Sequence, residues 1–220
     1  MDFSSIIQTW IAAVSNPNEE FYESERNKPD ATIATAVIWV VIAAVIAAVL
    51  GALRAAIGIN AMGGMDQIFA QMDLPPEMAQ QMSQMFSGGA VTGLAIGSIL
   101  LSLLMTPITF LIGVGIFWLV ARMLGGQGEY GRYAYLLSTF YAPLTVVSAV
   151  LGLVPLLGGC VSFIILIYQV VLTYFATKVE HRLTSGKAIV VALVPIIIFG
   201  LFIFCGAALI GALIVSNTNG

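Results

Sequence analysis

The chain has 220 residues, of which 60% are hydrophobic and only 9% are charged, and its formal net charge is -3. An average soluble domain carries about 25% charged residues, so a water-soluble globule could not cover its surface with so few charges. The composition also excludes a disordered chain, and the two cysteines exclude a disulfide-stapled secreted domain. The sequence therefore predicts an all-α fold, a polytopic bundle of transmembrane helices.

Long gaps between charged residues define the expected spans, since a helix needs about 20 apolar residues to cross a bilayer. The gap over 133–177 contains Pro155 and Gly158-Gly159 near its middle, and these turn residues predict a hairpin of two spans. The five expected spans are 31–54, 93–122, 132–154, 158–178 and 188–214. A re-entrant break near Pro107 would give six spans instead.

Lysine and arginine residues test the span count independently. With a cytoplasmic N-terminus, seven of the eight basic residues fall in cytoplasmic segments and only Arg54 falls outside. This asymmetry follows the positive-inside rule, and an even number of spans would remove it. We therefore expect residues 1–30 in the cytoplasm and 31–214 as one membrane domain, with the Met-rich segment 55–92 and the tail 215–220 outside.

The first 30 residues predict two short helices. Apolar residues at helical spacing over 3–14, with Trp10 at the centre, indicate an amphipathic helix in the cytoplasmic headgroup layer. A helix that only docks on the bundle is the plainer alternative. A second helix is expected to begin at Asn16-Pro17, where Asn caps it, Pro takes the first position and Glu19 and Glu20 follow.

Residues that usually carry chemistry are scarce. No ionisable residue lies deep in an expected span, which disfavours a proton-coupled pump or a voltage sensor. The only histidine, His181, is expected at headgroup level and not in a catalytic site. We therefore expect no enzyme activity, no catalytic residue, no cofactor and no nucleic-acid partner.

Sulfur-containing residues leave two alternatives open. The methionines of the outer segment suit either Cu(I) binding or packing of a helix on the outer leaflet. The spacing of Met78, Met82 and Met85 on one helix face favours packing, so we expect no bound metal. Cys160 and Cys205 are expected as free thiols, although the sequence does not settle whether they pair.

Small residues predict close helix packing. Gly89, Gly93 and Gly97 repeat every fourth residue, as do Ala43, Ala47 and Gly51. This spacing lets helices approach closely in lipid. We expect packing within the chain, with homo-oligomerisation as the alternative.

Polar side chains in the third and fourth spans form a candidate internal seam around a proline kink. Its members are Tyr133, Ser138, Thr139, Tyr141, Pro143, Tyr168, Gln169 and Thr173. Polar groups at membrane depth bond to one another or to a bound molecule. The seam is therefore either a link that holds the hairpin together or the site of a small transporter.

The glycine-rich loop Gly125–Arg132 lacks the Gly-Lys-Ser/Thr ending of a phosphate cradle. The loop is followed by Phe140-Tyr141-Ala142-Pro143-Leu144. Together these two segments resemble the central signature of the Yip family, five-span membrane proteins named for their interaction with Ypt/Rab GTPases. Trp10 with the Asn-Pro and Glu-Phe-Tyr segments, and Val179–Leu183 with Gly-Lys-Ala, are similar to the family's terminal motifs.

The resemblance implies a prokaryotic type of member. The Asp-Leu-Tyr-Gly-Pro motif of eukaryotic members is absent, and only about 30 residues precede the first expected span. Rab binding is therefore not implied, and a bacterial or archaeal plasma membrane is the expected location.

Two functions follow as hypotheses. The first is a non-enzymatic protein that organises membrane lipid or recruits a protein partner at its cytoplasmic face. The candidate contacts on that face are Trp10, Arg122, Arg132, Lys178, Arg182 and Lys187. The alternative is a small transporter or channel for a solute, ion or lipid that uses the polar seam, as an oligomer where one chain does not suffice.

Overall fold

The computed structural model describes residues 3–61, 67, 77–78, 81, 89–154, 157–194 and 196–198. All regular structure in this part of the chain is helical, as predicted. The elements are α1 (Phe3–Ser15), α2 (Glu19–Arg26), α3 (Ile33–Ala61), α6 (Gly89–Met123), α7 (Tyr130–Leu151) and α8 (Leu157–His181). A shorter apolar helix over Ser185–Val194 follows them.

Four helices are long and apolar enough to cross a membrane, and they match the first four expected spans. Their apolar segments are Ile33–Gly58, Ile96–Met123, Tyr130–Leu151 and Val161–His181. The predicted hairpin is confirmed, because α7 ends shortly before α8 begins and the two helices pack together.

Several predictions fall outside the described residues. The fifth expected span begins with the helix Ser185–Val194, but residues from 199 onward are not described. The same holds for Pro195, for Cys205 and for most of the segment 55–92. The five-span count, the orientation, the pairing of the cysteines and the role of the methionines therefore stay predictions.

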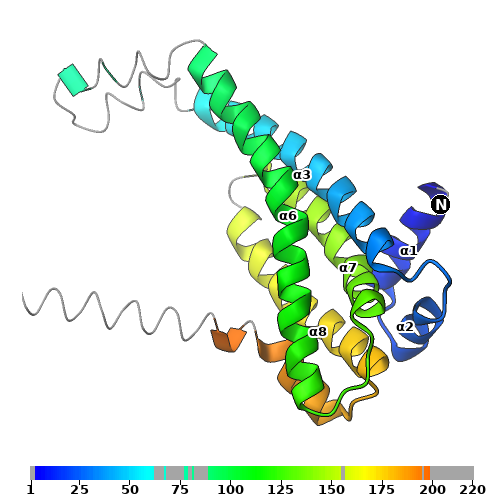
Figure 1. Cartoon of the computed structure of the whole chain (residues 1–220). Helices are drawn as coiled ribbons and strands as arrows, with labels where there is room; N and C mark the ends of the chain where they lie inside the picture. The colour runs from blue at the N-terminus through cyan, green and yellow to red at the C-terminus, as the bar shows by residue number, and fades with distance from the viewer. Residues whose placement is uncertain are drawn as a thin grey trace, which may run out of the picture.

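Helix α7 is the centre of the bundle. It packs against α3, α6, α8 and α1 (Figure 1). Tyr133, Tyr135 and Leu136 on α7 are almost completely buried. Tyrosine rings fill the core here because their hydroxyls find partners within the protein.

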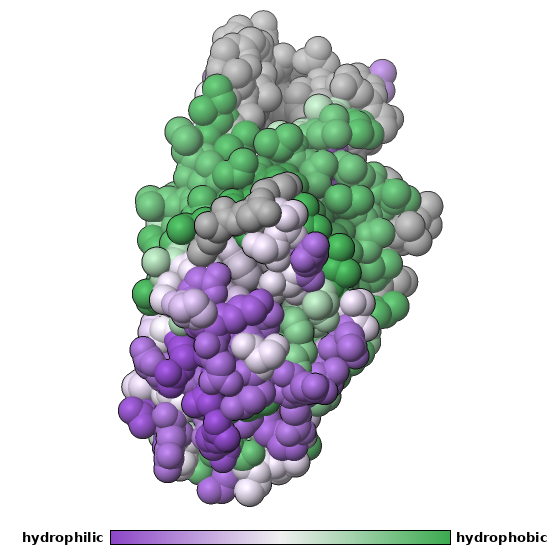
Figure 2. Space-filling view, turned by 90° about the vertical axis from the view of Figure 1, so that its right-hand side faces the viewer, coloured by the Kyte–Doolittle hydropathy of each residue, from purple (hydrophilic) through white to green (hydrophobic). Residues whose placement is uncertain are grey.

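The outer faces of the long helices are strongly apolar. Val49 on α3, Ile112 on α6 and Phe163 on α8 are all exposed. Figure 2 shows such residues as a hydrophobic band, with a polar region below it. A continuous exposed apolar band of this kind is stable against lipid and not against water.

A helix is present where the N-terminal amphipathic helix was expected, and one of its faces docks on the bundle. The rings of Trp10 and Trp39 meet edge to face with their centroids 6.2 Å apart, and the Tyr168 hydroxyl donates to the Val14 carbonyl. Ile7 and Ile11 lie on the exposed face of α1. The position of this helix in the headgroup layer stays a prediction.

The start of α2 differs from the expectation. The helix begins at Glu19, and its cap is Asn18, whose side chain accepts a hydrogen bond from the Phe21 backbone N–H at 2.7 Å. Asn16 instead accepts a hydrogen bond from the Asn18 side chain. Asn18 is preferred because its oxygen reaches the free N–H of the third helical residue, as N-cap residues do.

The small-residue pattern is only partly used for packing within the chain. Ala43 is buried in the core next to α7, which fits the prediction. In contrast, a Cβ atom added at Gly51, Gly93 or Gly97 would meet no described atom within 4 Å. These glycines therefore do not bring two described helices together, which corrects the expectation for α6.

We expect Ala36→Leu to lower the free energy of unfolding by about 1–3 kcal/mol, because an overpacked core forces side chains out of their rotamers. Ala36 on α3 is fully buried in the core. Ala52→Leu on the exposed face of the same helix should change stability by less than about 0.5 kcal/mol. Thermal unfolding in detergent measures both variants, and equal effects would contradict the placement of Ala36.

Candidate functional site at the polar end of the bundle

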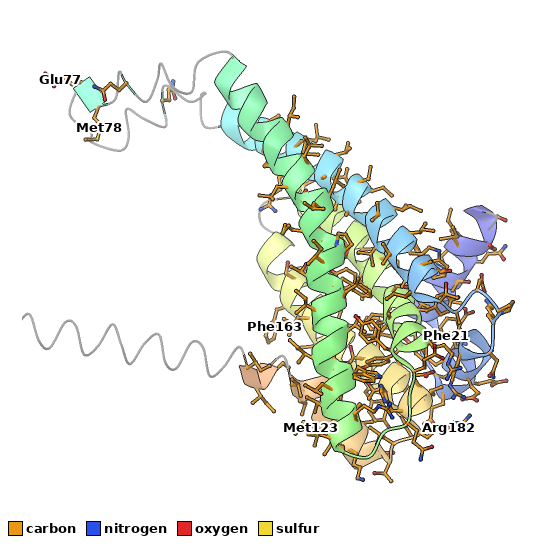
Figure 3. The ribbon with its side chains drawn as sticks, in the orientation of Figure 1. Phe21, Glu77, Met78, Met123, Phe163 and Arg182 are labelled. Atoms are coloured by element: carbon orange, nitrogen blue, oxygen red, sulfur yellow. The ribbon has the colours of Figure 1, made fainter. Side chains whose placement is uncertain are left out.

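Charged side chains gather at one end of the bundle, and we call this region the polar end. It consists of residues 19–28 with α2, the stretch 122–132 that connects α6 to α7, the last turns of α8 and the residues up to Lys187. Figure 2 shows it as the hydrophilic region below the apolar band, and Figure 3 places Met123 and Arg182 there. All three Yip-like motifs contribute residues to this region.

Glu180 on α8 connects the parts of the polar end. Its side chain is fully buried, and Oε2 accepts a hydrogen bond from Arg26 Nε at 2.9 Å. Oε1 accepts hydrogen bonds from the Glu129 backbone N–H at 2.8 Å and from Arg132 Nε at 3.3 Å. One buried carboxylate therefore joins α2, the loop and α7 to the end of α8.

Glu25 is a second buried carboxylate, and it joins α2 to α7. It accepts hydrogen bonds from the Tyr135 hydroxyl and from Lys28 Nζ, each at 2.7 Å. A buried charge is costly unless hydrogen bonds and opposite charges compensate it. These partners hold α2 against the bundle in one position.

The glycine-rich loop packs directly against His181. The Gly128 N–H donates to His181 Nδ1 at 3.3 Å, and the Gln127 N–H donates to the His181 carbonyl. A Cβ atom at Gly126 or Gly128 would lie 2.8 Å from His181 Nδ1, and Gly125 has a φ of 92°. Glycine is therefore required by close approach at two positions and by backbone conformation at the third.

This packing refines the expectations for the loop and for the histidine. The loop is a tight connection between α6 and α7, as predicted. His181 was expected at headgroup level, but its side chain is only 1% exposed and contacts the loop and the Tyr133 ring. The spacing of the glycines is the sequence signal for a close backbone approach, but the sequence does not identify His181 as the group that the loop approaches.

Helix α6 is attached to the same assembly by aromatic side chains. Trp118 Nε1 donates to the Gly128 carbonyl at 3.0 Å, and the Tyr130 hydroxyl donates to the Leu111 carbonyl at 2.8 Å. The Arg122 guanidinium lies 5.0 Å from the centre of the Trp118 ring, in a cation–π contact. The ends of α6, α7 and α8 are thus fixed relative to one another.

Most basic residues at the polar end pair with carboxylates of the same chain. Five of the seven do so, and the pairs are Arg26 with Glu23 and Glu180, Lys28 with Glu25, Arg132 with Glu129 and Glu180, Lys178 with Glu19, and Arg182 with Glu23. The expected cytoplasmic contacts Arg132, Lys178 and Arg182 are thus largely neutralised.

Arg122 and Lys187 are the two exceptions. Neither forms a salt bridge with a described carboxylate. Lys187 Nζ donates to the Leu124 carbonyl at 2.7 Å, which brings it close to the end of α6. Trp10, the remaining predicted contact, packs against Trp39 on α3.

A shallow cleft of about 420 Å³ lies between α2 and α8 at the polar end. Glu19, Glu20 and Glu23 line one side, and Lys178 and Arg182 line the other. Lys178 pairs with Glu19 and Arg182 pairs with Glu23 across the cleft, so its walls carry charges of both signs.

The structure divides the predicted polar seam into two groups. The first group is satisfied within the protein. The Tyr133 hydroxyl bonds to Thr177 Oγ1 at 2.7 Å, and the Ser138 and Thr139 hydroxyls donate to backbone carbonyls of α7. The Tyr133–Thr177 bond joins α7 to α8 and the bond from Tyr168 joins α8 to α1, whereas the Ser138 and Thr139 bonds lie within α7.

The second group of seam residues lines a groove between α6 and α8, with α7 as its floor. The groove has a volume of about 810 Å³, and Tyr141, Gln169 and Thr173 contribute to its lining. Pro143 lies within α7 but does not line the groove. The seam is therefore part structural link and part groove wall.

We expect Glu180→Gln to destabilise the protein by about 2–4 kcal/mol, because it leaves Arg26 and Arg132 without their buried counter-charge. Glu20→Gln is the matched control, since Glu20 is exposed and forms no salt bridge with a described residue. Thermal unfolding in detergent measures both. If the two variants had the same midpoint, Glu180 would not hold the polar end together.

Gly128→Ala should lower the free energy of unfolding by about 1–3 kcal/mol, because the added methyl group overlaps its neighbours. Its Cβ would lie 2.8 Å from Glu180 Cγ and from His181 Nδ1. Gly186→Ala, with nothing within 4 Å of its Cβ, should be neutral or stabilising. Protease sensitivity of the loop in detergent reports the difference, and a stable Gly128→Ala protein would refute the close approach.

Comparison with known proteins gives one match. No curated protein and no solved structure matches this chain. The family model described as the Yip1 domain matches residues 11–207, which include the glycine-rich loop, Glu180 and His181. The match covers most of the chain and agrees with four helices able to cross a membrane. This membrane protein therefore belongs to the Yip1 domain family.

Proposed function

We propose that the chain is a non-enzymatic integral membrane protein that recruits a protein partner at the polar end, which faces the cytoplasm. The observation that supports this proposal is the arrangement around Glu180. Three segments that lie far apart in the sequence are joined there into one folded surface, through Arg26, the Glu129 backbone and Arg132. A preorganised surface lowers the entropic cost of binding.

The charges of this surface favour a protein over a lipid bilayer as its principal partner. Anionic lipid attracts uncompensated Lys and Arg residues, each by about 1 kcal/mol. Most basic residues here are already paired with carboxylates. Fixed charges of both signs, as in the cleft between α2 and α8, instead select a partner with a complementary pattern.

The proposed location is a bacterial or archaeal plasma membrane. This proposal is supported by the likeness of Trp10, Asn16-Pro17 and Glu20-Phe21-Tyr22 to the N-terminal pattern of prokaryotic members. Under this proposal the N-terminal helices and the loop 124–129 lie in the cytoplasm, as the distribution of basic residues suggests.

A transporter is the second candidate, and the groove that contains Tyr141, Gln169 and Thr173 is the observation in its favour. The other lining residues, except Thr109, carry no polar side chain. A lining of this kind gives little to replace the hydration of an ion or polar solute. If the chain is a transporter, Gln169→Leu with Tyr141→Phe should abolish flux in liposomes, and unchanged flux would exclude that function.

Photo-crosslinking from two positions at the polar end tests partner recruitment. A photoreactive residue replaces Gln127 or Glu20, both of which are exposed. The control position is Leu100, which is exposed in the apolar band. In native membranes we expect both polar-end positions to capture the same protein in near-stoichiometric amount, and Leu100 not to capture it.

A purified complex completes the test. The captured protein should bind the full chain in nanodiscs, and charge reversal at Glu20 should weaken that binding. Capture of the chain by itself alone, or of lipid alone, at both polar-end positions would contradict the proposal.

A further inference from the structure

Helix α1 lies at the edge of the bundle, and only part of its apolar surface is covered by protein (Figure 1). Ile6, Thr9 and Ala13 are buried against the bundle, whereas Ile7 and Ile11 are exposed. Each of these two isoleucines is two residues from Thr9 and therefore lies about 160° from it around the helix. The bundle thus covers a polar threonine and leaves two isoleucines uncovered, so the buried face is not the most apolar face of α1.

Buried polar atoms without a partner gather around this contact. Four side-chain atoms in the described part of the chain are buried and make no hydrogen bond of ordinary geometry, and three of them are Trp10 Nε1 on α1, Trp39 Nε1 on α3 and the Tyr22 hydroxyl on α2. The two indole rings meet edge to face, and Tyr22 interacts electrostatically with Tyr168, which bonds to the end of α1. Buried donors without an acceptor are costly. The docked position of α1 is therefore less stable than its buried apolar area alone would give.

Helix α2 is anchored more firmly than α1. Hydrogen bonds to the buried carboxylates of Glu25 and Glu180 hold α2 against α7 and α8. Helix α1 contains no charged residue, so no salt bridge can hold it. The Tyr168 hydroxyl ties its end to α8 through the Val14 carbonyl. Residues 16–18 between the two helices lie outside regular structure, so α1 can move while α2 stays in place.

We propose that α1 is a releasable arm, which exchanges between its docked position and a position on the bilayer surface while α2 remains fixed. Ile7 and Ile11 are already exposed in the docked helix, so a roll of α1 about its axis turns the rest of its apolar face toward lipid. The Trp10 indole N–H then reaches water or a lipid headgroup, as interfacial tryptophans do. Release removes the ring of Trp10 from Trp39.

Release of α1 changes the molecular surface without disturbing the polar end. The hydrogen bonds that Glu180 accepts come from α2, from the Glu129 backbone and from Arg132, and none comes from α1. Trp39 is only 2% exposed in the docked state, and release uncovers it as an aromatic surface near the start of α3. The exchange can therefore hold or fail whether or not a protein binds at the polar end.

Thiol labelling of the full chain in nanodiscs measures the exchange. The reporter is Thr9→Cys in a background of Cys160→Ser and Cys205→Ser, because Thr9 is buried against the bundle in the docked state. A small cationic methanethiosulfonate reagent modifies the reporter. Ser15→Cys, exposed on the same helix, gives the rate for an open position. Ala121→Cys, fully buried in a separate cluster, gives the rate for wider unfolding.

The three rates distinguish an exchanging arm from a fixed one. We expect Thr9→Cys to be labelled more slowly than Ser15→Cys and several-fold faster than Ala121→Cys. A rate as low as that of Ala121→Cys would show that α1 stays docked and would overturn the proposal. A rate as high as that of Ser15→Cys would show that α1 does not dock, which would overturn it as well.

Two matched variants test the tie between α1 and the bundle. Tyr168→Phe removes the hydrogen bond to the Val14 carbonyl and should speed labelling of Thr9→Cys roughly fivefold, the effect of one ordinary hydrogen bond. Tyr22→Phe removes a buried hydroxyl that has no partner, so the labelling should be unchanged or slower. Equal labelling rates in the two variants would contradict the release of α1 and overturn the proposal.

A spin label at Ile11→Cys shows where the released arm lies. The label is attached in the Tyr168→Phe background, in which the released state is more populated. We expect oxygen, which concentrates in lipid, to relax the label more strongly than a water-soluble nickel complex does. The opposite result would show that α1 leaves the bilayer for water, and the proposed position on the bilayer surface would be wrong.

Discussion

The structure of the polar end depends on one buried carboxylate. Glu180 is fully enclosed, so its charge must be compensated within the protein. Arg26 on α2 supplies part of that compensation, and the Glu129 backbone N–H with Arg132, at the start of α7, supplies the rest. These groups can reach Glu180 together only when α2, the loop and the end of α8 are in their observed positions. The electrostatic requirement of a single side chain therefore fixes the geometry of a whole surface.

The glycine-rich loop is a steric consequence of the same arrangement. For the Glu129 N–H to reach Glu180, the preceding backbone must pass directly over His181. Any side chain at Gly126 or Gly128 would occupy the place of the imidazole ring. The loop and the end of α8 thus form a single contact, although 51 residues separate Glu129 from Glu180 in the sequence. This explains in physical terms why two Yip-like motifs occur together in one chain.

Hydropathy was sufficient to predict the helical class and the four spans that the structure describes, because the lipid environment constrains every spanning segment in the same way. The ion pairs of the polar end could not be predicted, since Arg26 and Glu180 meet only through tertiary packing. The pattern of polar residues located the seam but did not distinguish Tyr133, which bonds to Thr177, from Tyr141, which lines the groove. For Gly93 and Gly97 the prediction of close helix packing was wrong, because the spacing of small residues does not specify which face of α6 meets a neighbour.

The basic residues serve two separable purposes. Orientation in the membrane depends on the number of Lys and Arg residues at each side and is little affected by nearby carboxylates. Surface potential, in contrast, depends on net charge, and pairing with Glu residues removes most of it at the polar end. The charge that remains is at Arg122 and Lys187, near the end of α6, and neither residue lines the mixed-charge cleft between α2 and α8. A chain with so few charges can therefore carry the basic residues that set its orientation and still have a nearly neutral surface over most of the polar end.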